Sequence, residues 1–365
     1  MAYVAVKGGT KAIGHSIDLL RYERIKSECS IEIETIKQTM RHLVDQVMSE
    51  SSLYDKDLAA LAIKQAEGSI EEAVFILRAY RSTLPRHFYT RTVDTESMFV
   101  ERRISASFKD IPEGQILGAT TDYTHRLLDA SLKEETVEDM TKWLQSFFEK
   151  QPESLEELPK YPKVITYLRK EGLFPTYQDR NEQPKDVTTK SIQFPTTRGE
   201  RLQVLTRGQT GAVTALGYAA IRGYGAIHPT VGELRVGSIP LSIPSPIEQE
   251  EEEDYYIGTI QITEVESFIP HDILDEKGNH TIEFEIGYGV CYGQNETKAI
   301  AMSILDEALE RGDKRYPTND EEFVLLHIDS VESTGFISHL KLPHYVTFQS
   351  KLDSVRKVRK EEKNE

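Results

Sequence analysis

The sequence predicts an α+β fold, with a helical N-terminal module, a mixed α/β region with antiparallel strands, and a charged C-terminal helix. Three patterns support this prediction. Between residues 33 and 77 apolar side chains recur every three or four positions, which is typical of helices with one buried face. From residue 232 apolar and polar residues alternate, which is typical of strands. From residue 349 charged residues dominate, and we expect a helix that frays past residue 359.

The chain has 365 residues, a length that suits about two domains. We expect residues 1–175 to form a mainly helical N-terminal domain and residues 176–200 a linker or long loop, because prolines interrupt a polar stretch there. Residues 201–348 are then an α+β domain that carries a pair of histidines, and residues 349–365 the charged C-terminal helix or tail.

Composition narrows the class of protein. No run of about 18 apolar residues could cross a bilayer, and residues 1–6 are too short an apolar stretch for an export signal. The only two cysteines are Cys29 and Cys291, so we expect reduced thiols and a cytoplasmic protein without membrane contact. A net charge of -16 argues against nucleic-acid binding, which depends on basic surface.

The first expected elements are a strand over residues 2–6, a Gly-Gly turn, and a polar helix to about residue 26. A helix over residues 33–47 follows. Asp55 can cap the next helix, whose inward positions are 58, 61 and 62. Ser69 and Glu72 form a capping box at the start of a third helix.

Further along, residues 134–173 have an amphipathic helical pattern, in which Trp143, Phe147 and Phe148 are most simply core residues. A helix that begins near Thr210 is rich in small residues, so it can pack very closely against a partner. We expect strands at residues 232–243, 256–262, 284–292 and 323–328, and a helix at 295–311.

Residues 101–128 are rich in groups that could do chemistry. Paired arginines, Arg102 and Arg103, suit a carboxylate or a phosphate. Asp110 also lies in this stretch, and Asp122 and His125 are spaced to meet across one helical turn. Ordinary surface ion pairs would have the same composition, so both interpretations stay open.

Two glycine-containing turns could receive phosphate. Arg207 and Gly208 begin a small-residue helix but lack the Lys-Ser/Thr ending of a P-loop. Gly293 permits a sharp turn, Asn295 can cap the following helix, and Lys298 lies in its first turn. A cation is disfavoured there by the helix dipole unless an anion binds beside it. The alternative is that Lys298 pairs with a nearby carboxylate.

The segment FISHLKLPHY, residues 336–345, holds His339 and His344 on either side of Pro343. Two imidazoles on a proline-restricted segment are a plausible half of a metal site with open positions. The spacing is not that of one helical turn, so the rings converge only if the chain bends. The alternative is a purely structural pair.

Several blocks resemble one family: LRAYRSTL, ERRISASFKDIPEGQILG, DYTHRLLD, RGYG, YGVCYGQNETKA and GFISHLKLPHYV, together with YVAVKGGTKAI at the start. In this order they are similar to the I subunit of the bacterial carbon–phosphorus lyase system. The blocks cover nearly the whole chain. This sequence departs from the family mainly at residues 133–197 and in the acidic run near residue 250.

The resemblance implies a subunit of a core complex with subunits G, H and J, assisted by ATPase-type accessory subunits. It implies that methylphosphonate displaces adenine from ATP at the ribose anomeric carbon, giving α-D-ribose 1-methylphosphonate 5-triphosphate, and that the I subunit alone acts as a purine nucleosidase. It further implies that His339 and His344 bind Zn²⁺ beside iron–sulfur chemistry of subunit J. The competing hypothesis is a non-catalytic scaffold that supplies the zinc site to a neighbouring subunit.

Breaking an N-glycosidic bond passes through a cation-like anomeric carbon, so such a site needs an anion, a proton donor and phosphate-binding groups. We assign Asp122 or Asp110 to the ribosyl cation and His125 to protonation of the base. Mg²⁺ is expected to accompany the triphosphate. The candidate phosphate-binding residues are Arg102, Arg103, Arg207, Gly208, Gly293, Asn295 and Lys298.

Overall fold

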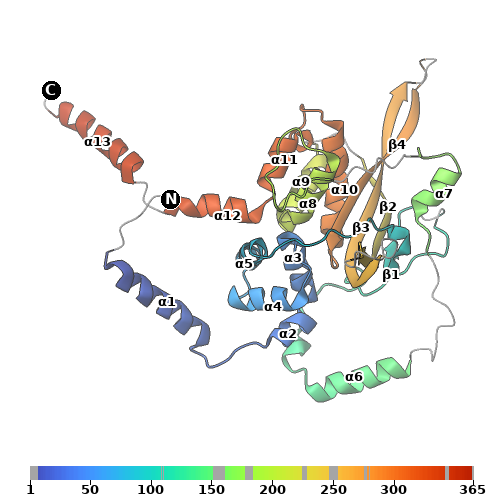
Figure 1. The fold of residues 1–365 in the computed structure, drawn as a ribbon, viewed down its shortest axis with the longest axis horizontal. Helices are drawn as coiled ribbons and strands as arrows, with labels where there is room; N and C mark the ends of the chain where they lie inside the picture. Colours follow the sequence, from blue (N-terminus) through green and yellow to red (C-terminus); the bar gives the residue numbers. More distant parts are fainter. Residues whose placement is uncertain are drawn as a thin grey trace.

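The computed structural model describes residues 7–107, 109, 111–150, 161–176, 184–223, 228–245, 254–274, 278, 280–341 and 345–363. Within them the α+β prediction is confirmed: one four-stranded antiparallel sheet is combined with helices (Figure 1). No helix of the described part is long and apolar enough to span a bilayer. The expected strand at residues 2–6 lies outside the described residues.

The sheet has the strand order β1-β2-β3-β4. Its strands are β1 (Phe99–Ile104), β2 (Thr230–Ile243), β3 (Tyr255–Leu274) and β4 (His280–Tyr292). Leu234 pairs with Val265, which in turn pairs with Gly289. Because successive side chains of a strand point to opposite faces, these three positions share one face of the sheet, and their sequence neighbours share the other.

Helix α10 (Glu296–Arg311) packs against the face that carries Leu234 and Val265. At two points β4 and α10 meet backbone to backbone: a Cβ added to Gly287 would lie 1.9 Å from Ser303 O, and one added to Gly289 would lie 2.0 Å from Ala299 O. The glycines are therefore needed for the close approach of these layers.

Three helices cover the other side of α10: α8 (Arg198–Arg207), α9 (Thr210–Ile221) and α11 (Glu321–His327). The expected close packing of the small-residue helix is confirmed, since a Cβ on Gly217 would lie 2.8 Å from the Cβ of Ala301. The predicted strand at residues 323–328 is wrong. Its residues form α11 instead, because Asp320 caps that helix by accepting hydrogen bonds from the N–H groups of Glu322 and Phe323.

The N-terminal helical module has its own apolar core. It consists of α2 (Ile33–Thr39), α3 (Arg41–Ser51), α4 (Lys56–Gln65) and α5 (Ile70–Ser82). The single helix expected over residues 33–47 is broken at Met40, whose φ of -113° and ψ of 42° are not helical. The Asp55 cap is confirmed, because its carboxylate accepts a hydrogen bond of 2.9 Å from Leu58 N. Leu61, expected to face inward, is 45% exposed.

The opposite face of the sheet is covered by α7 (Val164–Lys170) and the segment that follows it. Val164 and Leu168 are buried there, and Phe174 packs on Phe268 with ring centroids 4.6 Å apart. Short 3-10 turns complete the described chain: η1 (Thr95–Ser97), η3 (Ala130–Lys133), η4 (Pro317–Asn319) and η5 (His339–Lys341).

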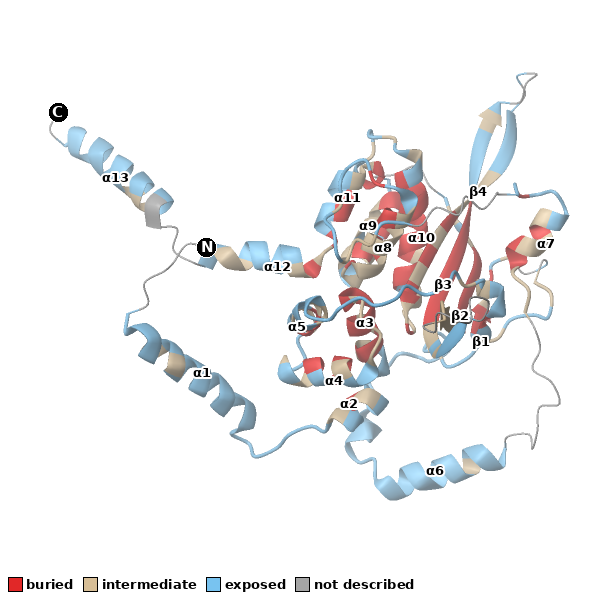
Figure 2. Cartoon of the chain, in the orientation of Figure 1, coloured by how far each residue is buried: buried red, intermediate tan, exposed pale blue. Residues whose placement is uncertain are grey.

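Three helices stand away from this body: α1 (Gly9–Ile25), α6 (Val137–Glu149) and α13 (Tyr345–Glu361) (Figure 1). A fourth, α12 (Ser330–Ser338), packs on the helical module by its first residues, where Ser330 is buried and Val331 contacts the module's core. The described parts of α1, α6 and α13 are drawn mostly as exposed in Figure 2. The core assignment of the α6 aromatic residues is wrong: Trp143 is 64% exposed and Phe148 is 67% exposed. An amphipathic pattern predicts that a face can be buried but does not say whether this chain or another one buries it.

Candidate functional site

The histidine segment begins where α12 ends. His339 opens η5, and its Nδ1 donates a hydrogen bond of 2.8 Å to the carbonyl of Phe336. In a neutral ring this places the lone pair on Nε2, which is the tautomer that a metal ligand needs. His344 lies outside the described residues. Within the described part no group of three or more His, Cys, Asp or Glu side chains is arranged to hold a metal.

No helix carries Asp122 and His125. Residues 121–124 form a bend and a turn, residues 125–128 have no regular secondary structure, and both side chains are exposed. The Asp122 carboxylate instead accepts hydrogen bonds from Arg102 at 2.5 Å and from Arg126 at 3.2 Å. Glu296 lies 2.9 Å from Arg102 Nε. Arg102 is therefore held between two carboxylates, and Asp110, the other carboxylate of this stretch, lies outside the described residues.

Arg103 lies on the opposite face of the sheet from Arg102 and is fully buried. Its Nε donates a hydrogen bond of 2.6 Å to Glu233, and its two terminal nitrogens donate to the carbonyls of Pro112 and Pro162, each at 2.8 Å. The side chain has no exposed surface, so it offers no contact to a ligand.

Arg103 belongs to a group that we call the sheet network. This network consists of three cations and three carboxylates, all buried or nearly so. They are Arg103, Lys163, Arg235, Glu233, Glu264 and Glu266. Glu264 is central, because Lys163 lies 3.0 Å from one of its oxygens and Arg235 2.5 Å from the other. Burial alone would raise the pKa of Glu264, but these two cations lower it to about 2.

The predicted turn before α10 has the expected backbone. Gly293 has a φ of +66°, and the Asn295 side chain caps α10 by accepting a hydrogen bond from Lys298 N. A carboxylate of the chain already lies at this helix start, since Asp45 accepts a hydrogen bond of 3.0 Å from Gln294 N. A Cβ on Gly293 would lie 2.2 Å from Asp45 Cγ. Asp45 therefore takes the place that we expected a phosphate to take.

Lys298 is fully buried, and its ammonium donates a hydrogen bond of 2.6 Å to the carbonyl of Thr206. Burial lowers its pKa. Among the described residues no carboxylate forms an ion pair with this ammonium, so the expected carboxylate partner is not found there.

Arg207 is the last residue of α8, and Gly208 follows it. Gly208 is closely packed, because an added Cβ would lie 2.7 Å from Val213 and 3.0 Å from Ile328. The Arg207 side chain instead joins a group that we call the arginine cluster, which consists of Arg78, Arg81, Arg86 and Arg207. Of the residues predicted to bind phosphate, Arg207 alone combines a partly exposed side chain with neighbouring cations.

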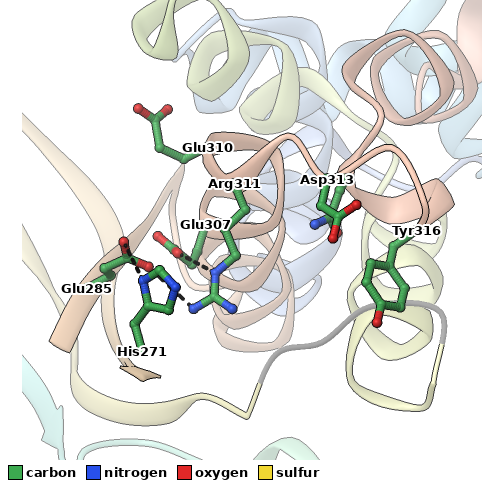
Figure 3. A pocket seen from close by; sticks show the side chains of 8 residues that line it. His271, Glu285, Glu307, Glu310, Arg311, Asp313 and Tyr316 are labelled. Carbon is green, nitrogen blue, oxygen red and sulfur yellow. Dashed lines mark hydrogen bonds and ion pairs between the residues drawn. The ribbon is translucent and has the colours of Figure 1, made fainter. Parts of the chain in front are cut away.

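A second polar site was not predicted from the sequence. It is a pocket of about 340 Å³ between the end of the sheet and α10 (Figure 3). Arg311 lies 2.9 Å from Glu307 and 3.3 Å from Glu285, and His271 lies 3.3 Å from Glu285. Burial and a hydrogen bond with Glu285 raise the pKa of Glu307 to about 8. These residues come from three successive elements, β3, β4 and α10, and the pairing of the strands and the packing of the helix bring them together, so no local motif could reveal them.

Comparison with known proteins covers almost the entire chain. The family model described as bacterial phosphonate metabolism protein (PhnI) matches residues 2–362. A putative C-P lyase subunit protein, HtxH, from Stutzerimonas stutzeri is 44% identical over 98% of this chain and 95% of its own length. Two relatives are named alpha-D-ribose 1-methylphosphonate 5-triphosphate synthase subunit PhnI. The one from Rhizobium meliloti is 43% identical over 98% of this chain and 95% of its own length, and the one from Escherichia coli is 42% identical over 99% of each.

Proposed function

Because the chain belongs to the PhnI family of bacterial phosphonate metabolism proteins, we propose that it is the I subunit of an α-D-ribose 1-methylphosphonate 5-triphosphate synthase. The observation that carries this proposal is similarity over full length: relatives of that name share 42% and 43% identity over nearly all of both chains. The two free thiols, Cys29 and Cys291, suit a cytoplasmic reaction.

The reaction that follows from this proposal is ribosyl transfer. The bond between the anomeric carbon of ATP and adenine breaks, a bond from that carbon to a methylphosphonate oxygen forms, and adenine leaves with a proton. With water in place of methylphosphonate the same site is a purine nucleosidase, which is the activity that we propose for the chain alone. Both reactions need an anion beside the anomeric carbon and cations beside the triphosphate, with its Mg²⁺.

The residues available for these roles are fewer than the sequence suggested. Asp122 is 46% exposed and His125 is exposed on the same segment, so both remain candidates for the ribosyl cation and for the leaving base. Arg207 remains the candidate for phosphate. The full burial of Arg103 and Lys298 removes them from our proposal.

We further propose that His339 and His344 hold Zn²⁺ together with a ligand from a partner subunit. The hydrogen bond from His339 Nδ1 to Phe336 supports this, since it sets the ring to ligate through Nε2. Bound there, zinc would act as a Lewis acid toward a phosphoryl or phosphonyl oxygen. Two protein ligands are fewer than the three typical of catalytic zinc, so a third ligand from subunit J fits the proposal.

The exposed apolar residues of α6 support the assembly with subunits G, H and J and with ATPase-type accessory subunits. They support equally a second candidate function, in which the chain is a scaffold that supplies the zinc site to a catalytic neighbour. The two candidates differ in whether this chain itself contacts the ribose and the base.

Release of adenine from ATP tests the proposal. The purified chain and the assembled complex, with and without methylphosphonate, are incubated with ATP, and free adenine is followed by chromatography. We expect hydrolysis by the chain alone and formation of the ribosyl phosphonate by the complex. Asp122→Asn should abolish both without loss of assembly. If the chain alone is inactive and the Asp122→Asn complex has full activity, the scaffold function is correct.

Metal analysis tests the zinc proposal separately. In the assembled complex, His339→Ala should lower zinc content, and His271→Ala is the matched control because His271 lies in the pocket of Figure 3. Unchanged zinc in the His339 variant would make this histidine structural.

A further inference from the structure

The arginine cluster lies where the N-terminal helical module meets α8 and the segment 186–188. Arg78 and Arg81 come from α5, Arg86 follows that helix, and Arg207 ends α8. Guanidinium groups repel one another, so a group of four needs compensating anions. The positions of those anions decide what the cluster can do.

Two of the four arginines have carboxylate partners. Arg78 forms an ion pair of 2.5 Å with Asp329 and donates two further hydrogen bonds, of 3.0 and 2.8 Å, to the carbonyl of Glu50. Arg86 lies 3.6 Å from Asp186 and is 44% exposed. Arg78 is therefore a structural residue that ties α5 to the start of α12, while Arg86 lies at the rim of the cluster.

Arg81 and Arg207 have no carboxylate partner among the described residues. Arg207 donates a hydrogen bond of 3.0 Å to the carbonyl of Val187, and Arg81 one of 3.4 Å to that of Thr188. The Nε atom of each side chain is buried and has no acceptor. Both guanidinium groups thus hold unused donors beside the carbonyls of Val187 and Thr188, and the carboxylates that act on them, Asp186 on Arg81 and Asp329 and Glu332 on Arg207, lie beyond ion-pair distance.

This arrangement is unfavourable for folding as it stands. Burial, with repulsion from Arg78 and Arg81, lowers the pKa of Arg207 to about 10 although Asp329 and Glu332 oppose the shift, and burial also lowers the pKa of Arg81 against the opposing effect of Asp186. Even so, both remain charged at neutral pH. A partly buried cation with no counter-ion within ion-pair distance costs free energy, and an anion bound beside it lowers that cost. Planar guanidinium forks match phosphate oxygens better than any other side chain.

We propose that Arg81 and Arg207, with Arg86 at the rim, bind a phosphoryl group of the nucleotide triphosphate. This names the triphosphate contact of the proposed function and rests on it. The site is built from two elements that the helical module and α8 bring together, rather than from the glycine turns at residues 208 and 293.

Direct binding of tripolyphosphate to the full chain tests the proposal by titration calorimetry. We expect the Arg81→Gln/Arg207→Gln variant to bind tripolyphosphate and ATP at least about tenfold more weakly, the loss typical of one charged contact. Its affinity for adenosine, which has no phosphate, should not change. Arg356→Gln is the matched control, because Arg356 is 61% exposed on α13 and forms an ion pair with Asp353 of the same helix.

Thermal melting distinguishes a binding role from a structural one. Tripolyphosphate should raise the Tm of the wild type and of Arg356→Gln, but not that of the double variant. Without the ligand, the double variant should melt at the wild-type temperature or above it, because the variant removes two unmatched charges. A lower Tm that tripolyphosphate still raises would overturn the proposal.

The remaining outcomes separate this site from the proposed function. If the wild-type complex releases adenine and the double variant binds tripolyphosphate normally, the function holds and the site is wrong. If the complex releases no adenine but tripolyphosphate binding depends on Arg81 and Arg207, the site holds and the function is wrong. In a third outcome, tripolyphosphate does not bind the wild type and the double variant fails to co-purify with a partner subunit. The arginine cluster then pairs with a carboxylate of that partner, and the proposal is wrong.

Discussion

Two groups of arginines in this protein, one buried and one partly buried, have their positive charge compensated in different ways. In the sheet network three cations face three carboxylates, and the Arg103 guanidinium has a hydrogen-bond acceptor for each of its three nitrogens. In the arginine cluster, Arg81 and Arg207 donate hydrogen bonds to carbonyls, and no carboxylate of the described residues lies within ion-pair distance of either. The difference teaches that burial of a cation is not itself a sign of function. The informative property is whether the protein supplies the counter-charge.

The pocket beside α10 shows a third solution. Carboxylates outnumber cations in this pocket. Glu307 lies against Glu285 and has a pKa of about 8, so it is protonated at neutral pH and adds no second negative charge. A carboxylate can lose its charge near neutral pH, whereas an arginine with a pKa of about 10 cannot. Excess negative charge can therefore be neutralised by a proton, but excess positive charge needs a bound anion.

The largest expected effect comes from unbalancing the sheet network. Arg103→Met should lower the free energy of unfolding by about 3–5 kcal/mol, because it leaves Glu233 buried without its cation. Urea unfolding at neutral pH measures this loss. Arg103→Met/Glu233→Met should recover much of the stability, since the pair is then removed together. A loss below about 1 kcal/mol in the single variant would show that the balance of the network does not matter.

A moderate, pH-dependent effect is expected from Glu307. Its pKa is about 8 in the folded chain against an ordinary value of 4.5, so between these values the folded state binds the additional proton. The contribution of Glu307 to the free energy of unfolding is therefore fully present below pH 4.5 and is lost as the pH rises toward 8. Glu307→Gln should therefore flatten the decline of Tm over this interval.

The comparison variant for that experiment is Glu310→Gln, which lies in the same pocket but is 53% exposed. It should keep the wild-type decline of Tm. A wild-type Tm that rises between about pH 5 and pH 8, with the same rise in Glu307→Gln, would contradict the protonated state of Glu307.

A smaller effect on stability is expected from the arginine cluster. Arg207→Gln should change the free energy of unfolding by no more than about 0.5 kcal/mol, in the stabilising direction, because an unmatched charge is removed. Urea unfolding without added phosphate measures it. A loss of stability as large as that of Arg103→Met would show that Arg207, like Arg103, has its charge compensated within the folded chain.

The smallest effect on the isolated chain is expected from α6. Trp143→Ala/Phe148→Ala should leave the urea midpoint unchanged, since neither side chain is buried in this chain. Co-purification with the other subunits of the C-P lyase complex should nevertheless fail. If assembly is normal, or if the isolated chain loses stability, α6 does not provide a partner surface.

Local signals predicted much of the fold. The Asp55 and Asn295 caps, the small-residue helix and the alternating strands were correct because each depends on residues close in the chain. The aromatic face of α6 could not be assigned correctly, since periodicity does not identify the partner. The apolar run of residues 323–328 predicts a strand, whereas the Asp320 cap begins a helix there.

The candidate site was harder to predict for a different reason. Arg102 and Arg103 are neighbours in sequence, but successive side chains of a strand point to opposite faces of the sheet. Arg102 therefore contacts Asp122, whereas Arg103 belongs to the sheet network. Asp45, which occupies the helix start near Gly293, comes from 249 residues earlier in the chain. The cluster around Arg207 likewise depends on Arg81, which α5 contributes. Contacts between residues so distant in the chain depend on tertiary packing, which cannot be inferred from the spacing of residues in the sequence.

The two glycines of β4 have a consequence for how mutational data on this protein would be interpreted. In a library selected for growth on methylphosphonate, positions 287 and 289 should accept glycine alone, because any Cβ would come within 2.0 Å of a carbonyl oxygen of α10. Their intolerance would resemble that of residues that contact substrate. A screen of the same library for soluble expression should reject the same variants. Loss of soluble protein would show that these glycines are required for the packing of β4 on α10 and not for contact with substrate.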